Sequence, residues 1–275
     1  MDYRAALPKR NRDAHKGQCG RIGIIAGTRM PGAAVLAALG ALRVGAGFVY
    51  VISDHPHAAM MAIRYPELIV LSSKDPWPEL DAVVVGPGLG EMDDALCSRL
   101  LKLSCPFVVD ADALVAEFLA RLIPHRAVLT PHPGEFSRLW GPVGEDRVLS
   151  AQRAARQSRQ VVLLKGAGSV VADGTHTHVN PTGNAGMATA GAGDVLAGVI
   201  GGFLGQGLTL WDAAMLGAYW HGVAGDLAFQ KYGNGLIASD IALFVAQGIN
   251  GVELRGFSGR PEAESNTDAG REEKG

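Results

Sequence analysis

The stretch from Arg21 to Ser53, RIGIIAGTRMPGAAVLAALGALRVGAGFVYVIS, decides the fold class. Its first part, RIGIIAG, is a short and continuous apolar run, which is typical of a strand covered on both faces. The alanine- and leucine-rich segment that follows predicts a helix closing on glycine, and FVYVIS predicts a second buried strand. Two buried strands separated by a helix indicate a parallel sheet built from βα units.

The same alternation continues along the chain. Further buried strands are predicted at AVVVG (82–86), FVVD (107–110), AVLT (127–130) and VVLLK (161–165). SVVADG (169–174) and THTHVN (175–180) predict a short antiparallel pair. Later helices are expected at about 192–206, 210–231 and 238–247. The sequence therefore predicts an α/β fold with a doubly wound, mostly parallel sheet flanked by helices.

Composition and charge exclude several classes of protein. Of the 275 residues, 48% are hydrophobic and 19% are charged, which excludes a disordered chain or a coiled coil. A net charge of -2 gives no basic footprint for nucleic acid. Cys19, Cys97 and Cys105 have no metal-ligand spacing and fit a reducing compartment. We see neither a signal peptide nor a membrane span, so we expect a cytoplasmic protein with no membrane partner.

The chain divides into three segments by composition. Residues 1–15 form an N-terminal extension, 16–255 a single domain, and 256–275 a polar, charged tail that we expect to be disordered. Glycine is frequent, with 37 residues, and there is no collagen-like repeat. In a folded enzyme, such an excess indicates tight turns and backbone that lies close to a ligand.

The most informative motif lies within NPTGNAGMATAGAGDVLAGVIGGFLGQG, residues 180–207. The glycine-rich loop 191–193 opens directly into a helix that begins near Asp194. Backbone N–H groups and the helix N-terminus together favour phosphate there. Asp194 is placed to take a proton from a substrate hydroxyl that attacks a phosphoryl group. The alternative, equally favoured by the local pattern, is that Asp194 only complements the helix dipole and the glycines only allow close packing.

The string GNAGMATAGAGDVLAGVIGG (183–202) resembles the signature of the NAD(P)H-hydrate dehydratases, which belong to the ribokinase-like superfamily. Six other blocks resemble the family in the expected order. They are KGQCGRIGIIAG (16–27), PGAAVLAALGALRVGAG (31–47), VVVGPGLG (83–90), VVDADAL (108–114), LTPHPGEFSRL (129–139) and VLLKGAGSVV (162–171). The resemblance covers residues 16 to about 247, and it implies a ribokinase-like fold. Several blocks in one order are far more specific than one glycine loop.

The resemblance also implies an activity. The family repairs NADHX and NADPHX, which are hydrated, inactive forms of the reduced nicotinamide cofactors. A nucleotide phosphorylates the C6 hydroxyl of the S epimer, and elimination of phosphate then restores NADH or NADPH. Bacterial-type members use ADP with Mg²⁺ and release AMP. In this interpretation Asp194 is the base, and the glycine loop holds the transferring phosphoryl group through its N–H donors.

Individual site residues follow from the same resemblance. Ala34, Gly88, His132 and Asp194 match contacts to the hydrated cofactor. Lys165, Gly166, Ala167, Gly168, Ser169 and Gly193 match contacts to the nucleotide, made mostly through backbone. Without the resemblance, Gly88 is an ordinary turn residue, His132 a helix cap and Lys165 a surface charge.

Two departures from related patterns bear on these residues. Glu135 follows His132 by three positions, a spacing similar to the N-x-x-E element of related sugar kinases, whose glutamate helps to place magnesium. Since His132 replaces asparagine, a first-turn dipole role for Glu135 is equally favoured. Ala192 stands where many members have a hydroxyl residue, which removes one hydrogen bond to phosphate. We expect Asp110, Asn180 and Asn184 to support the site as polar neighbours.

Two other functions remain open at this point. One is a kinase of the same fold that acts on a small alcohol such as a vitamin precursor. The other is a nucleotide-binding sensor without catalysis, which would not need an acid after the glycine loop. We also expect a homo-oligomer, most simply a tetramer. Epimerization of the R and S hydrates is expected from another chain, since about 15 residues precede the dehydratase-like block.

Overall fold

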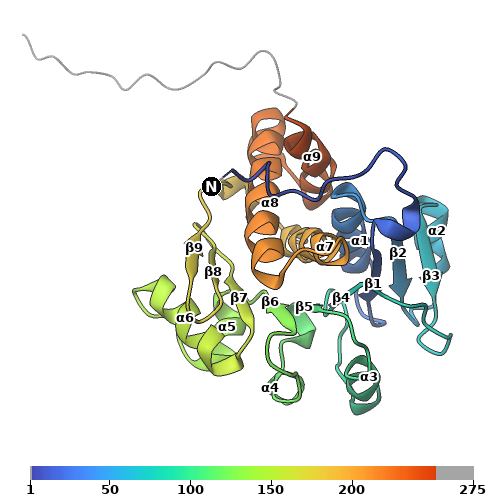
Figure 1. Ribbon diagram of the computed structural model, residues 1–275, viewed down its shortest axis with the longest axis horizontal. Helices are drawn as coiled ribbons and strands as arrows, with labels where there is room; N and C mark the ends of the chain where they lie inside the picture. The colour runs from blue at the N-terminus through green and yellow to red at the C-terminus, as the bar shows by residue number, and fades with distance from the viewer. Residues whose placement is uncertain (1, 252–275) are drawn as a thin grey trace, which may run out of the picture.

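One sheet of nine strands forms the centre of the molecule (Figure 1). The computed structural model describes residues 2–251, so the tail expected at 256–275 lies outside the described residues. The strands are β1 (Arg21–Ile25), β2 (Phe48–Ile52), β3 (Leu68–Leu71), β4 (Ala82–Val85), β5 (Phe107–Val109), β6 (Ala127–Leu129), β7 (Val161–Leu164), β8 (Val170–Ala172) and β9 (Thr177–Val179). Their order is β3-β2-β1-β4-β5-β6-β7-β8-β9.

The strand directions confirm the predicted sheet. All pairs from β3 through β7 are parallel, while β7–β8 and β8–β9 are antiparallel. The predicted strands are present, each shorter by a residue or more at its ends. The edge strand β3 was not predicted, because only Leu68 of its four residues is buried. The helix before it, α2 (Ala59–Arg64), spans six residues, too few to give a clear helical period.

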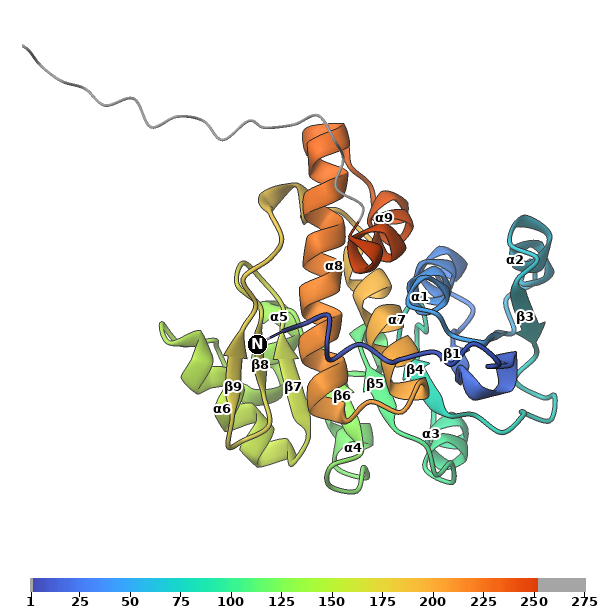
Figure 2. The same cartoon turned by 45° about the horizontal axis from the view of Figure 1, so that its top comes forward.

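Helices cover both faces of the sheet. One face carries α1 (Pro31–Arg43), α7 (Ala192–Gly205), α8 (Leu210–Tyr232) and α9 (Ala238–Asn250), with α2 beside β3 (Figure 2). The other carries α3 (Asp94–Leu100), α4 (Ala116–Leu119), α5 (Pro133–Trp140) and α6 (Arg147–Ser158). Single 3₁₀ turns are η1 (Lys16–Gln18), η2 (Ala111–Ala113), η3 (Ala185–Met187) and η4 (Gly233–Gly235).

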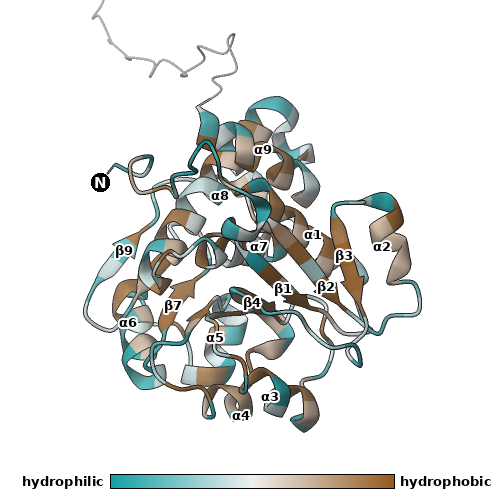
Figure 3. Cartoon of the chain, turned by 45° about the vertical axis from the view of Figure 1, so that its right-hand side comes forward, coloured by the Kyte–Doolittle hydropathy of each residue, from teal (hydrophilic) through white to brown (hydrophobic). Residues whose placement is uncertain are grey.

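Strands β4 to β8 are apolar and buried along their whole length because both faces of the sheet are covered there, whereas the edge strand β9 is more polar (Figure 3). Val84 of β4 packs into the core under α1 and α7, whereas Val83 and Val85 pack into the core on the α3 to α6 side. Within residues 2–251, no helix combines the length and the apolar character needed to cross a membrane.

The direction of chain progression reverses between β1 and β4. From β1 the chain proceeds outward through β2 to β3, and from β4 it proceeds the other way through β5, β6 and β7. The helices that join these two sets lie on opposite faces. In such sheets the loops after the two central strands diverge and leave a crevice beyond their carboxyl ends. The loops after β1 and β4 are therefore expected to border a ligand site.

Helices α1 and α7 lie in direct backbone contact. A Cβ atom at Gly198 would lie 1.8 Å from the carbonyl oxygen of Ala37, and one at Gly40 would lie 2.4 Å from that of Val195. Only glycine at these two positions permits so close an approach. The contact fixes the N-terminus of α7 relative to that of α1.

The N-terminal segment packs against the domain. It runs across α8 toward β1 (Figure 2). The ring of Tyr3 stacks on Tyr219 of α8 at a centroid distance of 3.7 Å, and its hydroxyl lies 3.3 Å from Nε2 of His178 on β9.

Candidate active site

The N-terminus of α7 is an uncapped helix end. Its N-cap is Gly191, with φ of 90°, and no side chain in the described residues hydrogen-bonds at this position. A side chain at Gly191 would also collide with Leu36, whose Cδ1 would lie 2.4 Å from the new Cβ. The N–H of Ala192 donates to the carbonyl of Thr189 at 3.3 Å, so the N–H groups of Gly193 and Asp194 are the ones that point out of the helix with its partial positive charge. This geometry suits a phosphate oxygen.

Asp194 lies in that first turn and is partly buried. Burial, and then the nearby charge of Asp110, raise the pKa of Asp194 to about 7, while Lys165 opposes the shift. A carboxyl group with a pKa near the working pH is well suited to exchange a proton with a hydroxyl.

Lys165 reaches into the site from the end of β7. Its Nζ lies 2.7 Å from Oδ1 of Asp110 and 3.7 Å from Oε2 of Glu135. Only 18% of the lysine side chain is exposed, unlike an ordinary surface lysine. Burial alone would lower its pKa, but the carboxylates of Asp110 and Glu135 outweigh that effect and the pKa is raised. Lys165 is therefore a fixed cation, and its Nζ lies 3.3 Å from the position that a Cβ of Gly193 would take.

His132 and Glu135 form the N-terminus of α5. Nδ1 of His132 accepts hydrogen bonds from the N–H groups of Gly134 (2.9 Å) and Glu135 (3.3 Å). Oε2 of Glu135 accepts one from the N–H of His132 at 2.8 Å. The helix-capping role of His132 is thus confirmed, and its contact with the hydrated cofactor stays a prediction. Glu135 lies in the first turn of α5 as expected, and its carboxylate additionally faces Lys165, while its dipole and magnesium roles both stay predictions.

The loop that follows β7 exposes backbone at Ala167 and Gly168, whereas the N–H and the carbonyl of Gly166 both bond to Oγ of Ser169. Gly166, Ala167 and Gly168 are exposed, and Ser169 closes the loop by donating its Oγ–H to the carbonyl of Gly166 at 3.0 Å. Exposed N–H and carbonyl groups on a closed loop fit the expected backbone contacts to a nucleotide. Binding of a nucleotide by Lys165 to Ser169 stays a prediction.

Arg147 supports this loop and was not identified from the sequence. Its Nη2 donates to the carbonyl of Lys165 at 3.1 Å and to that of Leu164 at 3.4 Å. The guanidinium also occupies the space beside Gly166, where a Cβ would lie 2.6 Å from Nη1. An arginine at the start of an amphipathic helix carries no signal that distinguishes it from a solvated charge.

His221 of α8 was likewise missed. It is buried, and its Nε2 lies 2.9 Å from the carbonyl oxygen of Ala192. Burial lowers the pKa of His221 to about 4, so the ring is neutral and Nε2–H donates the bond. His221 thereby fixes the first turn of α7, in which the side chain of Ala192 is buried.

The polar residues before the glycine loop have structural partners. Asn184 caps η3 by accepting from the N–H of Gly186, and its amide donates to Asp226 at 2.8 Å. Asn180 is buried and donates to the carbonyl of Ala218 at 3.2 Å. Both asparagines therefore shape the path of the chain into α7.

Gly88 lies in the loop after β4, and Ala34 lies near the N-terminus of α1. Gly88 has φ of 65°, and a Cβ there would lie 2.1 Å from the carbonyl oxygen of Met30, so the loops after β1 and β4 are packed together. Ala34 has no exposed surface, because its methyl group joins the core beneath α1. The exposed residues at this helix end are Met30 and Gly32. Substrate contacts at Gly88 and Ala34 stay predictions.

The comparisons with known proteins agree with this site. The profile of the NAD(P)H-hydrate dehydratase family matches residues 22–245. The chain belongs to this family. It is therefore an enzyme of the hydro-lyase class, and the nucleotide sensor without catalysis is set aside.

Relatives and solved structures support the same assignment. A bifunctional NAD(P)H-hydrate repair enzyme of Coxiella burnetii is 42% identical over 252 residues, which cover 86% of this chain and 51% of the relative. The chain spans about half the length of the curated relatives it matches. An ADP/ATP-dependent NAD(P)H-hydrate dehydratase of Bacillus subtilis, co-crystallized with ATP and Mg²⁺, superposes with a TM-score of 0.81 at 30% identity, covering 91% of this chain and 96% of that one.

A ribokinase-like superfamily protein of Enterococcus faecalis superposes with a TM-score of 0.77 at 25% identity, covering 90% of this chain and 94% of that one. The expected ribokinase-like fold is therefore confirmed.

Proposed function

We propose that this chain dehydrates the S epimers of NADHX and NADPHX with ADP as phosphoryl donor, restoring NADH or NADPH and releasing AMP and phosphate. The observation that carries the proposal is the pairing of Asp194, whose pKa is about 7, with the uncapped first turn of α7. A base and a phosphate cradle in one helical turn suit phosphorylation of a hydroxyl group.

The steps follow from the positions of these groups. Asp194 takes the proton of the C6 hydroxyl as that oxygen attacks the β-phosphorus of ADP. The bond from this phosphorus to the bridging oxygen breaks, and AMP leaves. The N–H groups of the first turn of α7 and the ammonium of Lys165 stabilise the charge of the phosphoryl oxygens. Phosphate then leaves C6 with its electron pair, the neighbouring carbon loses a proton, and the ring double bond returns.

The choice between ADP and ATP depends on which phosphoryl group of the bound nucleotide reaches the glycine loop. With adenosine along Lys165 to Ser169, the β-phosphoryl group of ADP reaches the first turn of α7. A γ-phosphate would extend into the space of the substrate hydroxyl. The Bacillus subtilis relative is described as ADP/ATP-dependent, so the choice is open to direct measurement.

Magnesium fits this site as part of the nucleotide complex. In residues 2–251, no group of three or more His, Cys, Asp or Glu side chains could hold a metal ion. In phosphoryl transfer, Mg²⁺ is usually held by one or two carboxylates together with the phosphates of the substrate. Glu135 and Asp110 are the acidic side chains beside Lys165, and either would serve in that way. The ion would neutralise charge on the phosphates as they react.

The test is an assay with purified protein, NADHX, Mg²⁺ and either ADP or ATP. We expect reduced-nicotinamide absorbance to return with release of free phosphate, and kcat/KM to be higher with ADP. Asp194→Asn should lower turnover by on the order of 10²-fold while nucleotide affinity changes little. A stable phosphoester in place of free phosphate would instead identify a small-molecule kinase. A tenfold advantage for ATP, about 1.4 kcal/mol, would reject ADP dependence alone.

Three further properties complete the proposal. An epimerase that interconverts the R and S hydrates would act in the same pathway, and the bifunctional relatives, of whose length this chain spans about half, support that pairing. The three cysteines of the present chain are free and buried, which supports a reducing compartment such as the cytoplasm. The assembly is proposed to be a homotetramer.

A further inference from the structure

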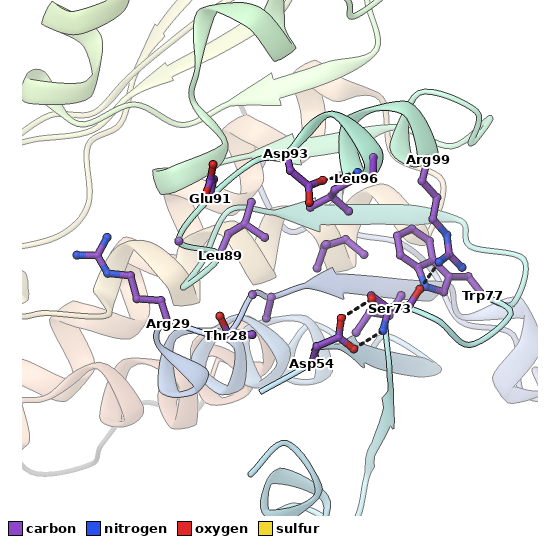
Figure 4. Close-up of a pocket in the computed structure, with 16 residues that line it drawn as sticks. Thr28, Arg29, Asp54, Ser73, Trp77, Leu89, Glu91, Asp93, Leu96 and Arg99 are labelled. Carbon is purple, nitrogen blue, oxygen red and sulfur yellow. Dashed lines mark hydrogen bonds between the residues drawn. The ribbon is translucent and has the colours of Figure 1, made fainter. Parts of the chain in front are cut away.

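A crevice of about 630 Å³ opens where the chain direction reverses in the sheet (Figure 4). Thr28 and Arg29 after β1, and Leu89 and Gly90 after β4, form its inner wall, and Asp54 lies on the side of β2. This is the position at which doubly wound sheets bind nucleotides. Neither Asp194 nor Lys165 lines this crevice, so it has no role in the chemistry of the proposed reaction.

A hydrogen bond between the loops after β4 and β5 links the crevice to the neighbourhood of the reaction site. Gly90, which lines the crevice, donates its N–H to Oδ2 of Asp112 at 2.8 Å. Asp112 in turn is close enough to Asp194 to contribute to its raised pKa. A hydrated dinucleotide has two nucleoside halves, and only the nicotinamide ring reacts. With that ring at Asp194, the adenosine half would lie in this crevice, on the far side of Asp112.

Asp54 is held rigidly at the crevice. Its Oδ1 accepts from Oγ of Ser72 at 2.7 Å and from the N–H of Ser73 at 2.9 Å, and its Oδ2 accepts from Oγ of Ser73. These bonds, led by the Ser73 hydroxyl, lower the pKa of Asp54, so it remains ionised. A carboxylate has about four lone-pair positions. Three are occupied, and the exposed side chain retains one for a ligand.

We propose that this crevice binds the adenosine half of the hydrated dinucleotide and that Asp54 accepts a hydrogen bond from its ribose 2′-hydroxyl, so that the chain prefers NADHX to NADPHX. The inference rests on the proposed function. In βαβ dinucleotide sites an acidic residue about 20 residues beyond the glycine loop binds this hydroxyl. A phosphate at the 2′ position carries a charge of about −1.5 to −2, which the carboxylate would repel.

The two arginines that line the crevice, Arg29 and Arg99, have their guanidinium groups directed elsewhere than to Asp54. The guanidinium of Arg99 stacks over Trp77 at 3.9 Å and donates to the carbonyls of Asp75 (2.8 Å) and Ser73. The side chain of Arg29 points away from Asp54 (Figure 4). Lys74 is close enough to contribute to the low pKa of Asp54, but it does not line the crevice.

The first experiment compares kcat/KM for NADHX and NADPHX with ADP and Mg²⁺. We expect the full chain to favour NADHX by about tenfold, the effect of one nearby like charge of roughly 1.4 kcal/mol. Asp54→Asn keeps most of the serine hydrogen bonds and should bring the ratio close to one. Asp75→Asn is the matched control, because Asp75 borders the same turn without lining the crevice, and it should leave the ratio unchanged.

A second experiment needs no turnover. NADH and NADPH are titrated by calorimetry, with quenching of Trp77 emission followed against a Trp77→Phe variant. Tighter binding of NADH, lost in Asp54→Asn, supports the proposal even if neither hydrate is repaired, in which case the proposed function alone fails. Equal affinities that Asp54→Asn does not change, or no binding of either product, overturn the inference. The inference is also overturned if the protein binds NADPH more tightly than NADH and Lys74→Gln abolishes this preference.

Discussion

The ammonium of Lys165 lies 2.7 Å from Oδ1 of Asp110, so an ion pair joins the ends of β7 and β5 beside the first turn of α7. Asp110 is buried, with 1% of its surface exposed. A buried carboxylate is costly unless it is paired, and the pairing holds Lys165 at the phosphate cradle rather than on Asp194. The site therefore keeps a fixed cation and a separate base within one cluster.

Asp110→Asn should lower the pKa of Asp194 and shift the pH dependence of turnover. The charge of Asp110 is the second cause of the raised pKa, after burial. Without that charge, the rising limb of kcat/KM against pH should move to lower pH, with turnover reduced by about tenfold or more because Lys165 is less well held. If Asp110 had a purely structural role, Asp110→Asn would lower turnover without shifting the curve of kcat/KM against pH. An unchanged midpoint of that curve therefore contradicts this prediction.

The unmodified protein should show a rising pH–rate profile. Asp194 acts as a base only when ionised, so kcat/KM should rise about tenfold per pH unit below pH 7 and level off above it. The effect of rising pH on the stability of the fold is opposite to its effect on the rate. The folded protein holds this proton more tightly than the unfolded chain, so Asp194 lowers the free energy of unfolding as pH rises from 3.8 to about 7. Initial rates between pH 5 and pH 9, with NADHX stability controlled, check the profile.

Gly193 should tolerate alanine poorly and valine not at all in nucleotide binding. A Cβ at this position lies 3.3 Å from Nζ of Lys165, so a methyl group displaces the ammonium slightly, and a branched side chain blocks the cradle. We expect affinity for ADP to fall several-fold in Gly193→Ala and beyond detection in Gly193→Val, while circular dichroism stays native. Calorimetry measures both. Native affinity in the valine variant would place the phosphate elsewhere.

His221 should make the fold sensitive to acid. Its pKa is about 4 in the folded protein and 6.5 in a model peptide, so the unfolded chain takes up the proton first. Stability from this residue is full above pH 6.5 and falls by about 3 kcal/mol as pH drops to about 4. His221→Gln keeps a donor for the Ala192 carbonyl without titrating. Its Tm should therefore depend less on pH between 6.5 and 4.5, and parallel curves would contradict this origin.

Much of the fold could be predicted because its strands are covered on both faces. Apolar runs such as AVVV in β4 have no other explanation in a chain of this composition. The edge strand β3 was not predicted, because it is half exposed and follows a helix of only six residues. Edge elements lack the periodic signal on which such predictions depend.

The site was predictable only in part. The glycine loop and Asp194 form a local pattern, so their placement at a helix N-terminus could be read directly. The Lys165–Asp110 pair joins residues 55 positions apart, and a lone lysine or aspartate carries no sign of its partner. His221 and Arg147 act on backbone carbonyls of other elements, and such contacts have no sequence pattern.

The backbone contact between α1 and α7 fixes the distance between the N-termini of the two helices. Neither helix can slide against the other, because the carbonyl of Ala37 occupies the place of a side chain at Gly198. A ligand that contacts both helix N-termini must therefore span the fixed distance between them. Adaptation to a longer or shorter substrate would therefore have to occur in the loops after β1 and β4. Changes of side chain along the helices would leave that distance unaltered.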